Sequence, residues 1–191
     1  MVDVVLFHHS GGLTPDVHAF ADLLRVTGRT VHTPDLFDGA TFADVADGVA
    51  HVEALGEAVF ARRAAEAVED LPVDVVYGGV SFGAARAAEQ VLARPGARGA
   101  FFLSGAVAPS WWGATWPPGV PAQAHVADGD PWREVDAEQE FSTDAPGAEL
   151  FVYPATGHLF AEPGHPDHEP AAAAVATQRV LAFLAALDAV G

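Results

Sequence analysis

The sequence contains no cysteine. A chain without thiols forms no disulfide, no thiolate metal site and no covalent intermediate through cysteine. Basic residues are scarce as well: nine lysines and arginines stand against 26 aspartates and glutamates, which gives a net charge of −17. A negative field of this size repels nucleic acid and anionic membranes. We therefore expect a small-molecule partner, and neither nucleic acid nor membrane binding.

Signals for export and for common cofactors are missing too. The first residues have no basic leader and no cleavage site, and no apolar run approaches the ~20 residues of a membrane span. Dinucleotide, Walker and zinc-protease motifs do not occur. Histidines at 8–9 and in the proline-broken segment 165–169 could suggest a metal, but the latter have no fixed helical spacing. We expect a cytoplasmic protein without cofactor or metal.

Apolar segments and turn signals alternate along the chain, whose 191 residues fit a single domain, 1–191. The predicted strands cover residues 2–8, 30–36, 73–78, 99–104, 121–127 and 148–153. The predicted helices cover 15–27, 42–55, 57–70, the segment after residue 81, 131–141 and 170–188. Strands that alternate with helices form a parallel sheet covered on both faces, which is an α/β fold. Ligands of such sheets bind beyond the carboxyl ends of the strands.

The motif Gly79-Val80-Ser81-Phe82-Gly83 follows the third predicted strand and precedes an alanine-rich helix. Strand, turn and helix in this order are the context in which G-x-S-x-G forms a nucleophile elbow. The turn strains the backbone at the serine, and the two glycines remove side chains that would collide across it. We predict that Ser81 is a nucleophile at the carboxyl edge of the sheet. The alternative is a tight turn with an incidental serine.

A serine nucleophile needs a base, and an acid that orients the base. His158 follows the last strand, and imidazole can accept and return a proton at neutral pH; the alternative is an exposed loop histidine. Asp128 and Asp130 both follow the fifth strand. Asp130 precedes a proline, which is also typical of a helix N-cap, whereas Asp128 precedes a glycine, which is typical of a turn. The order Ser, Asp, His is the one found on this architecture, and the acid stays open between the two aspartates.

An oxyanion hole needs two backbone donors. The expected donors are the N–H of Phe82, the residue after the nucleophile, and that of Ser10 or Gly11 in the loop after the first strand. His9 abuts this loop and is expected to touch the substrate or the nucleophile. The alternatives are that Gly11 and Gly12 form a flexible turn, or that this loop binds a phosphorylated ligand.

Aromatic residues follow several strands at the same edge. Three tryptophans, at 111, 112 and 116, stand in the loop after the fourth strand, where such residues either wall an apolar pocket or anchor the loop in the core. Two further aromatic residues adjoin the predicted acid and base. The substrate pocket is expected to be lined by His9, Trp111, Trp112, Trp132 and Phe160.

Five segments together resemble the dienelactone hydrolase family of the α/β-hydrolase superfamily, over nearly the whole chain. They are Phe7-His8-His9-Ser10-Gly11-Gly12-Leu13, Thr33-Pro34-Asp35-Leu36-Phe37-Asp38-Gly39, Gly79-Val80-Ser81-Phe82-Gly83-Ala84, Asp130-Pro131-Trp132 and Tyr153-Pro154-Ala155-Thr156-Gly157-His158-Leu159-Phe160. The resemblance implies a compact α/β-hydrolase fold with about six mostly parallel strands and no lid domain. It also implies that Asp130 is the acid and His158 the base.

Family enzymes that act on dienelactone use a cysteine nucleophile and a glutamate near the oxyanion loop. This chain instead has Ser81, with His9 or Ser10 in the region of the glutamate. Serine fits ordinary ester hydrolysis. We therefore expect a cofactor-independent carboxylic ester hydrolase that acts on small esters or lactones through Ser81, His158, Asp130 and an acyl-enzyme. The alternative is a non-catalytic small-molecule-binding protein on the same fold.

Overall fold

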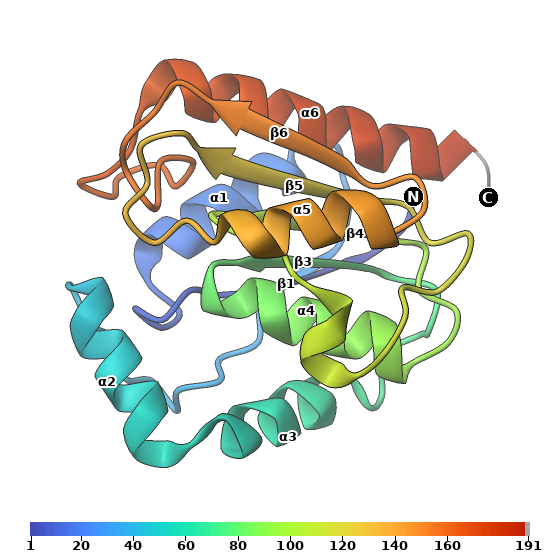
Figure 1. The fold of residues 1–191 in the computed structure, drawn as a ribbon, viewed down its shortest axis with the longest axis horizontal. Coiled ribbons are helices and arrows are strands. Elements are labelled where there is room, and N and C mark those ends of the chain that lie inside the picture. Colours follow the sequence, from blue (N-terminus) through green and yellow to red (C-terminus); the bar gives the residue numbers. More distant parts are fainter. Residues whose placement is uncertain (190–191) are drawn as a thin grey trace.

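Six parallel strands form one sheet in the computed structural model, which describes residues 1–189 (Figure 1). The order across the sheet is β2-β1-β3-β4-β5-β6. The strands are β1 (Val4–Phe7), β2 (Val31–His32), β3 (Val76–Val80), β4 (Gly99–Leu103), β5 (Ala122–Ala127) and β6 (Glu149–Tyr153). Because every pair of neighbouring strands is parallel, their carboxyl ends share one edge of the sheet. The strand order reverses direction beside β1, and ligands of such sheets bind at this edge.

Helices cover both faces of the sheet and form one further layer. The helices are α1 (Pro15–Arg25), α2 (Val45–Leu55), α3 (Glu57–Val68), α4 (Phe82–Ala93), α5 (Val135–Asp144) and α6 (Pro170–Ala189), with a short 3-10 helix η1 (Pro109–Trp112). Residues of α1 and α6 share one core cluster, whereas α3, α4 and α5 contribute to the other. In Figure 1, α2 and α3 lie outside α4, away from the sheet. The predicted α/β architecture is confirmed, and the fold shows no lid domain in residues 1–189.

Local sequence signals account for where α1 begins and ends. Thr14 caps the helix, because its hydroxyl accepts a hydrogen bond from the N–H of Val17 at 3.4 Å, and Pro15 occupies the first turn. One face of α1 is fully buried against the sheet and consists of Val17, Phe20, Ala21 and Leu24. Gly28, with φ of +84°, turns the chain back toward β2.

Two elements differ most from the sequence prediction. Strand β2 has two residues instead of seven, because the chain leaves the sheet before Pro34, and the N–H of Leu36 donates to Nε2 of His8 at 3.1 Å. Helix α5 begins at Val135 instead of residue 131. The side chain of Asp130 accepts the N–H of Trp132 at 2.8 Å and so holds a turn where a helix was expected.

Helix α6 also corrects the expectation that no apolar run reaches membrane length. It has 20 residues, and its mean hydropathy reaches 1.5, enough to cross a membrane by length and composition alone. Ala176, Val180 and Leu184 on this helix are fully buried in the core. Because a core helix meets the same criterion, this property gives no ground for a membrane assignment.

Candidate active site

Ser81 occupies the sharp turn between β3 and α4, with φ of 52° and ψ of −116°. This backbone region is costly for a residue with a side chain, by about 1–3 kcal/mol. Both glycines of the motif are required, because other parts of the backbone approach them closely. A β-carbon on Gly79 would collide with the backbone of Gly83, and one on Gly83 would collide with the backbone of Phe7. The chain therefore accepts strain at one position in order to present the Ser81 hydroxyl.

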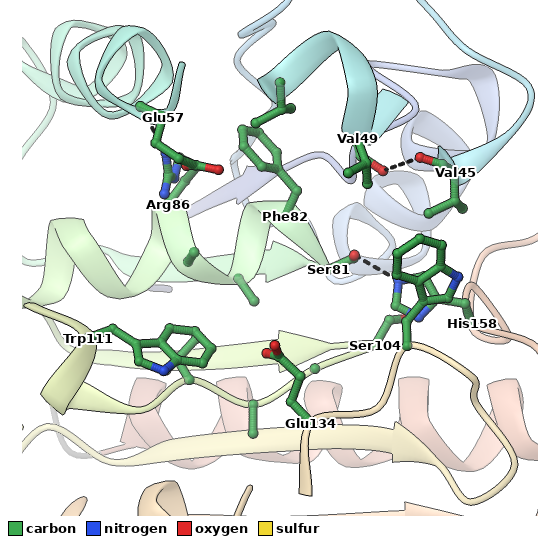
Figure 2. Close-up of a pocket in the computed structure, with 18 of the residues that line it drawn as sticks. Val45, Val49, Glu57, Ser81, Phe82, Arg86, Ser104, Trp111, Glu134 and His158 are labelled. Atoms are coloured by element: carbon green, nitrogen blue, oxygen red, sulfur yellow. Dashed lines mark hydrogen bonds and ion pairs between the residues drawn. The ribbon is translucent and has the colours of Figure 1, made fainter. Parts of the chain in front are cut away.

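A continuous chain of hydrogen bonds joins three loops at this edge. Oγ of Ser81 lies 2.7 Å from Nε2 of His158, a contact drawn in Figure 2. Nδ1 of the same ring lies 2.7 Å from Oδ2 of Asp130. Because a carboxylate only accepts, Nδ1 carries the proton, which leaves Nε2 to accept from the serine hydroxyl. The loops after β3, β5 and β6 thus bring the hydroxyl of Ser81, the carboxylate of Asp130 and the imidazole of His158 into one line of contacts.

Asp130, and not Asp128, contacts the histidine. The Asp130 side chain is 2% exposed, and its second oxygen accepts the N–H of Trp132. The Asp128 side chain is 74% exposed and pairs with Arg133 at 3.1 Å. The N-cap alternative for Asp130 is wrong, because α5 begins five residues later with Glu134 before it. The geometry therefore favours the residue that the family resemblance indicated.

The segment 165–169 contacts the loop that carries His158 and stabilises it. In the sequence, the histidines of this segment were a weak candidate for a metal site. Oε1 of Glu169 accepts the N–H groups of Thr156, at 2.6 Å, and Gly157, at 3.1 Å. These backbone hydrogen bonds lower the pKa of Glu169. A β-carbon on Gly157 would collide with the backbone of Asp167. Within residues 1–189, no group of three potential metal ligands occurs.

The hydrogen bonds in the loop after β1 indicate which of its two candidate oxyanion donors, Ser10 or Gly11, is better placed. The N–H of Gly11 is directed to Nδ1 of His9 at 2.9 Å, and that of Gly12 is directed to the carbonyl of His9 at 3.0 Å. Ser10 lines the cavity above the nucleophile. Phe82 is the first residue of α4, where an N–H has no partner within its helix. Ser10 and Phe82 are thus the better-placed pair. The engaged glycine N–H groups also argue against a phosphate-binding loop.

The cavity beside Ser81 has a volume of about 330 Å³. Val45, Val49 and Val52 of α2 form one wall, and Figure 2 shows two of them, Val45 and Val49, above Ser81. Helix α2 reaches this position because Gly48 lies against the backbone of Ser10, where a β-carbon would collide. The opposite wall includes Ser104, which directly follows β4.

Ser104 was not predicted from the sequence. It has φ of 58°, it is buried, and its hydroxyl has no hydrogen-bond partner in the described part of the chain. Strand β4 supports the nucleophile here, because the N–H of Ser81 donates to the carbonyl of Leu103 at 2.8 Å. No short sequence motif predicts such a residue, because its strained positive φ results only from its position at the end of the strand.

Of the tryptophans, Trp111 and Trp132 line the cavity. They are 49% and 47% exposed. Trp112 turns toward α4, where its indole N–H donates to Glu89 at 3.1 Å, so it is not a wall of this cavity. Trp116 is buried and donates to the carbonyl of Val120 at 2.7 Å. The loop after β4 therefore combines one cavity residue with two anchors.

Two further expected pocket residues lie elsewhere. Phe160 is fully buried in the core beside α1 and α6, with its ring 5.3 Å from that of Tyr153. His9 is only 3% exposed and faces Glu162 instead of Ser81. Both corrections have the same cause: these side chains point back into the protein, while their neighbours in sequence reach the edge.

Arg86 is the one buried cation at the cavity among the described residues. It was missed by the sequence analysis, because an isolated arginine in an alanine-rich helix carries no motif. Its guanidinium contacts Glu57 at 2.8 Å and Glu89 at 3.0 Å (Figure 2 shows the former). Burial raises the pKa of Glu89, and the Arg86 charge opposes that rise.

His8 and His125 are buried and serve the fold. Burial lowers the pKa of His8 to about 4 and that of His125 to about 3. Nδ1 of His8 contacts the carbonyl of His9 at 2.7 Å, while Nε2 accepts the N–H of Leu36. Nδ1 of His125 lies 2.7 Å from the hydroxyl of Tyr153. Neither ring reaches the cavity.

A parallel sheet that places an elbow serine after β3, with a histidine and an aspartate from later loops, defines an α/β hydrolase. The sequence matches the model of the dienelactone hydrolase family over residues 2–187. The chain belongs to this family. Among curated proteins, none matches it at a significant level.

Solved structures of hydrolases share the fold. A dienelactone hydrolase-like promiscuous phosphotriesterase, P91, from metagenomic libraries is 20% identical, with a TM-score of 0.73 over 98% of this chain and 87% of that one. A putative dienelactone hydrolase from Klebsiella pneumoniae is 17% identical, with a TM-score of 0.74 over 95% and 85%. Esterase PE8 is 18% identical, with a TM-score of 0.65 over 97% and 92%.

Proposed function

We propose that the protein hydrolyses small carboxylic esters or lactones with Ser81 as the nucleophile and without a cofactor. The observation that carries the proposal is the unbroken path from Ser81 Oγ through His158 to Asp130, with both hydrogen bonds at 2.7 Å. Membership of a hydrolase family and the esterases among the structural neighbours support the reaction class.

The first half of the reaction forms an acyl-enzyme. Oγ of Ser81 attacks the carbonyl carbon while Nε2 of His158 takes the hydroxyl proton. The carbonyl oxygen becomes an oxyanion, which the N–H groups of Phe82 and Ser10 stabilise. Asp130 keeps the proton on Nδ1 and stabilises the imidazolium. When the oxyanion collapses, the alkoxide leaves with the proton from His158 as an alcohol.

The second half releases the acid. Nε2 of His158 takes a proton from water, whose oxygen attacks the acyl carbon. The new tetrahedral oxyanion uses the same two donors. Its collapse returns Oγ to Ser81 with the proton from His158. Overall, one ester and one water yield one carboxylic acid and one alcohol, so the reaction needs no redox partner.

The test uses an activated short-chain aryl ester and a serine-directed fluorophosphonate. We expect turnover of the ester and a single label on Ser81, and the Ser81→Ala variant to lose both. Absence of turnover together with absence of the label in the wild-type protein overturns the proposal. Tight small-molecule binding that persists in Ser81→Ala, without any turnover, would instead favour the non-catalytic alternative.

A further inference from the structure

Acidic side chains dominate the charge around the cavity that contains Ser81. Glu53, Glu57 and Glu134 line it, against the single cation Arg86. The Arg86 charge is already opposed by Glu57 and Glu89, at 2.8 and 3.0 Å. Neither Glu53 nor Glu134 forms an ion pair within residues 1–189. The cavity that contains Ser81 is therefore lined by two exposed carboxylates whose charge no cation compensates among the described residues.

Glu134 is placed to act on a ligand and serves no evident purpose in the fold. It stands at the N-cap of α5, yet its side chain forms no capping hydrogen bond. In Figure 2 its carboxylate points into the cavity, on the side opposite Phe82 and between Trp111 and the His158 region. Helix caps are normally Ser, Thr, Asp or Asn, so the glutamate carboxylate at this position is not tied to the helix start. Here it faces the space that a substrate would fill.

Two indoles border the same space. Trp111 and Trp132 are about half exposed, and both line this cavity. Unlike Trp112 and Trp116, they have no hydrogen bond from the indole nitrogen among the described residues. The Trp132 ring lies 6.2 Å from that of His158. Among aromatic side chains, tryptophan binds cations best through its ring face, and quaternary ammonium groups are well-known ligands of such faces.

We propose that the cavity selects esters that carry a cationic, ammonium-type group, bound by the Glu134 carboxylate and the faces of Trp111 and Trp132. This inference rests on the proposed function, because it names the substrate class for the same nucleophile. The net charge of −17 acts in the same direction, since it raises the local concentration of cations and lowers that of anions. Arg86, held between two carboxylates, does not offer its charge to an anionic substrate.

The experiment compares a choline ester with the 3,3-dimethylbutyl ester of the same acid. The two substrates have the same shape, and a carbon in one replaces the charged nitrogen of the other. We expect kcat/KM to be higher for the choline ester by about tenfold. A factor of this size corresponds to the binding free energy of a partly exposed cation–π contact together with one carboxylate contact. This ratio should fall toward one in Glu134→Gln. It should also fall in Trp111→Leu.

The matched control is Asp144→Asn. Asp144 is the last residue of the same helix, it is exposed, and it lines neither this cavity nor the neighbouring pocket that contains Trp111 and Glu134, so the variant removes the same charge away from the site. The ratio should keep its wild-type value in this control. Equal rates for the two esters in the wild-type protein overturn the inference and leave the proposed function standing. An equal loss for both esters in Glu134→Gln, which indicates a structural role, overturns it as well.

A binding measurement keeps the inference testable even if neither ester is hydrolysed. Choline should quench the tryptophan fluorescence of Ser81→Ala, and its affinity should fall about tenfold when Glu134→Gln is added. The neutral isostere 3,3-dimethylbutanol should bind more weakly than choline to Ser81→Ala. If the two ligands bind equally, the cavity has no preference for a cation and the inference fails, whatever the outcome of the ester assays.

Discussion

Nε2 of His9 lies 3.1 Å from Oε2 of Glu162, and both side chains are buried. This contact joins the loop after β1, which carries Ser10, to the loop after β6, which carries His158. Because Nδ1 of His9 accepts the N–H of Gly11, the ring proton sits on Nε2. The contact with Glu162 is at ion-pair distance but lacks hydrogen-bond geometry, so Nε2 and both carboxylate oxygens have no hydrogen-bond partner among the described residues. The two loops that surround the nucleophile therefore share one polar contact beneath the cavity.

Glu162→Ala should weaken both folding and catalysis. It removes the carboxylate that Nε2 of His9 approaches and leaves a cavity at a fully buried position, which should cost about 1–3 kcal/mol of unfolding free energy. It also frees the loop that positions Ser10, so kcat for an aryl ester should fall while KM changes little. Denaturant unfolding and steady-state kinetics measure the two effects. Glu162→Gln keeps an oxygen for His9 and should retain most of both properties; identical behaviour of the Ala variant and the wild type would contradict this role.

Strain at Ser81 predicts a difference between two inactive variants. Ser81→Ala and Ser81→Gly both remove the hydroxyl and should lower kcat by about 10³-fold or more. Only glycine adopts φ of 52° with ψ of −116° without strain. Ser81→Gly should therefore unfold at a higher denaturant concentration than Ser81→Ala. Its unfolding free energy should be larger by about 1 kcal/mol, after the extra conformational entropy that glycine loses on folding is subtracted. Equal midpoints would show that this turn stores no strain.

The two aspartates after β5 should differ sharply when each is changed to asparagine. Asp130→Asn offers an amide to Nδ1 of His158 and favours the wrong tautomer, which should lower kcat by about 10³–10⁴-fold. Asp128→Asn changes only an exposed contact to Arg133 and should leave kcat within about twofold. Single-turnover and steady-state assays on the aryl ester compare them. Comparable losses in both variants would mean that Asp130 does not orient the base.

Acid should destabilise the fold through its buried histidines. The pKa of His8 is lowered to about 4 and that of His125 to about 3, whereas both titrate near ~6.5 when unfolded. Between pH 6.5 and 4 the unfolded chain thus binds more protons, so the unfolding free energy falls as pH falls, by up to about 1.4 kcal/mol per pH unit for each ring. Urea unfolding at pH 7, 5.5 and 4.5 measures this slope.

A variant pair isolates the histidine contribution to that slope. His8→Asn removes one buried titrating ring and should flatten the dependence of the unfolding free energy on pH between 4.5 and 6.5. His18→Asn changes an exposed histidine on α1 and serves as the control. If the His8 and His18 variants show the same slope as the wild type, protonation of His8 does not limit stability in acid.

The sequence predicted the elements whose signals are local. Thr14 and Pro15 determine the start of α1, and Gly79 and Gly83 fit the elbow, because each of these residues acts on its immediate neighbours. The order of the strand-end residues also indicated the meeting of Ser81 and His158, since parallel strands end at one edge.

The remaining features depend on contacts between distant segments, which no local pattern encodes. Phe160 follows the active loop in sequence but packs into the core, and His9 pairs with Glu162 across 153 positions. Arg86 and Glu134 reach the cavity only because α4 and α5 begin at the sheet edge. The choice between Asp128 and Asp130 likewise depends on a turn whose hydrogen bond to Trp132 the sequence did not predict.

The packing of Gly48 against Ser10 has a consequence for how this enzyme could be regulated. Helix α2 supplies the valine wall of the cavity, and the same helix lies against the backbone of Ser10, the proposed oxyanion donor. Any displacement of α2 that widens the entrance therefore also removes the support of Ser10.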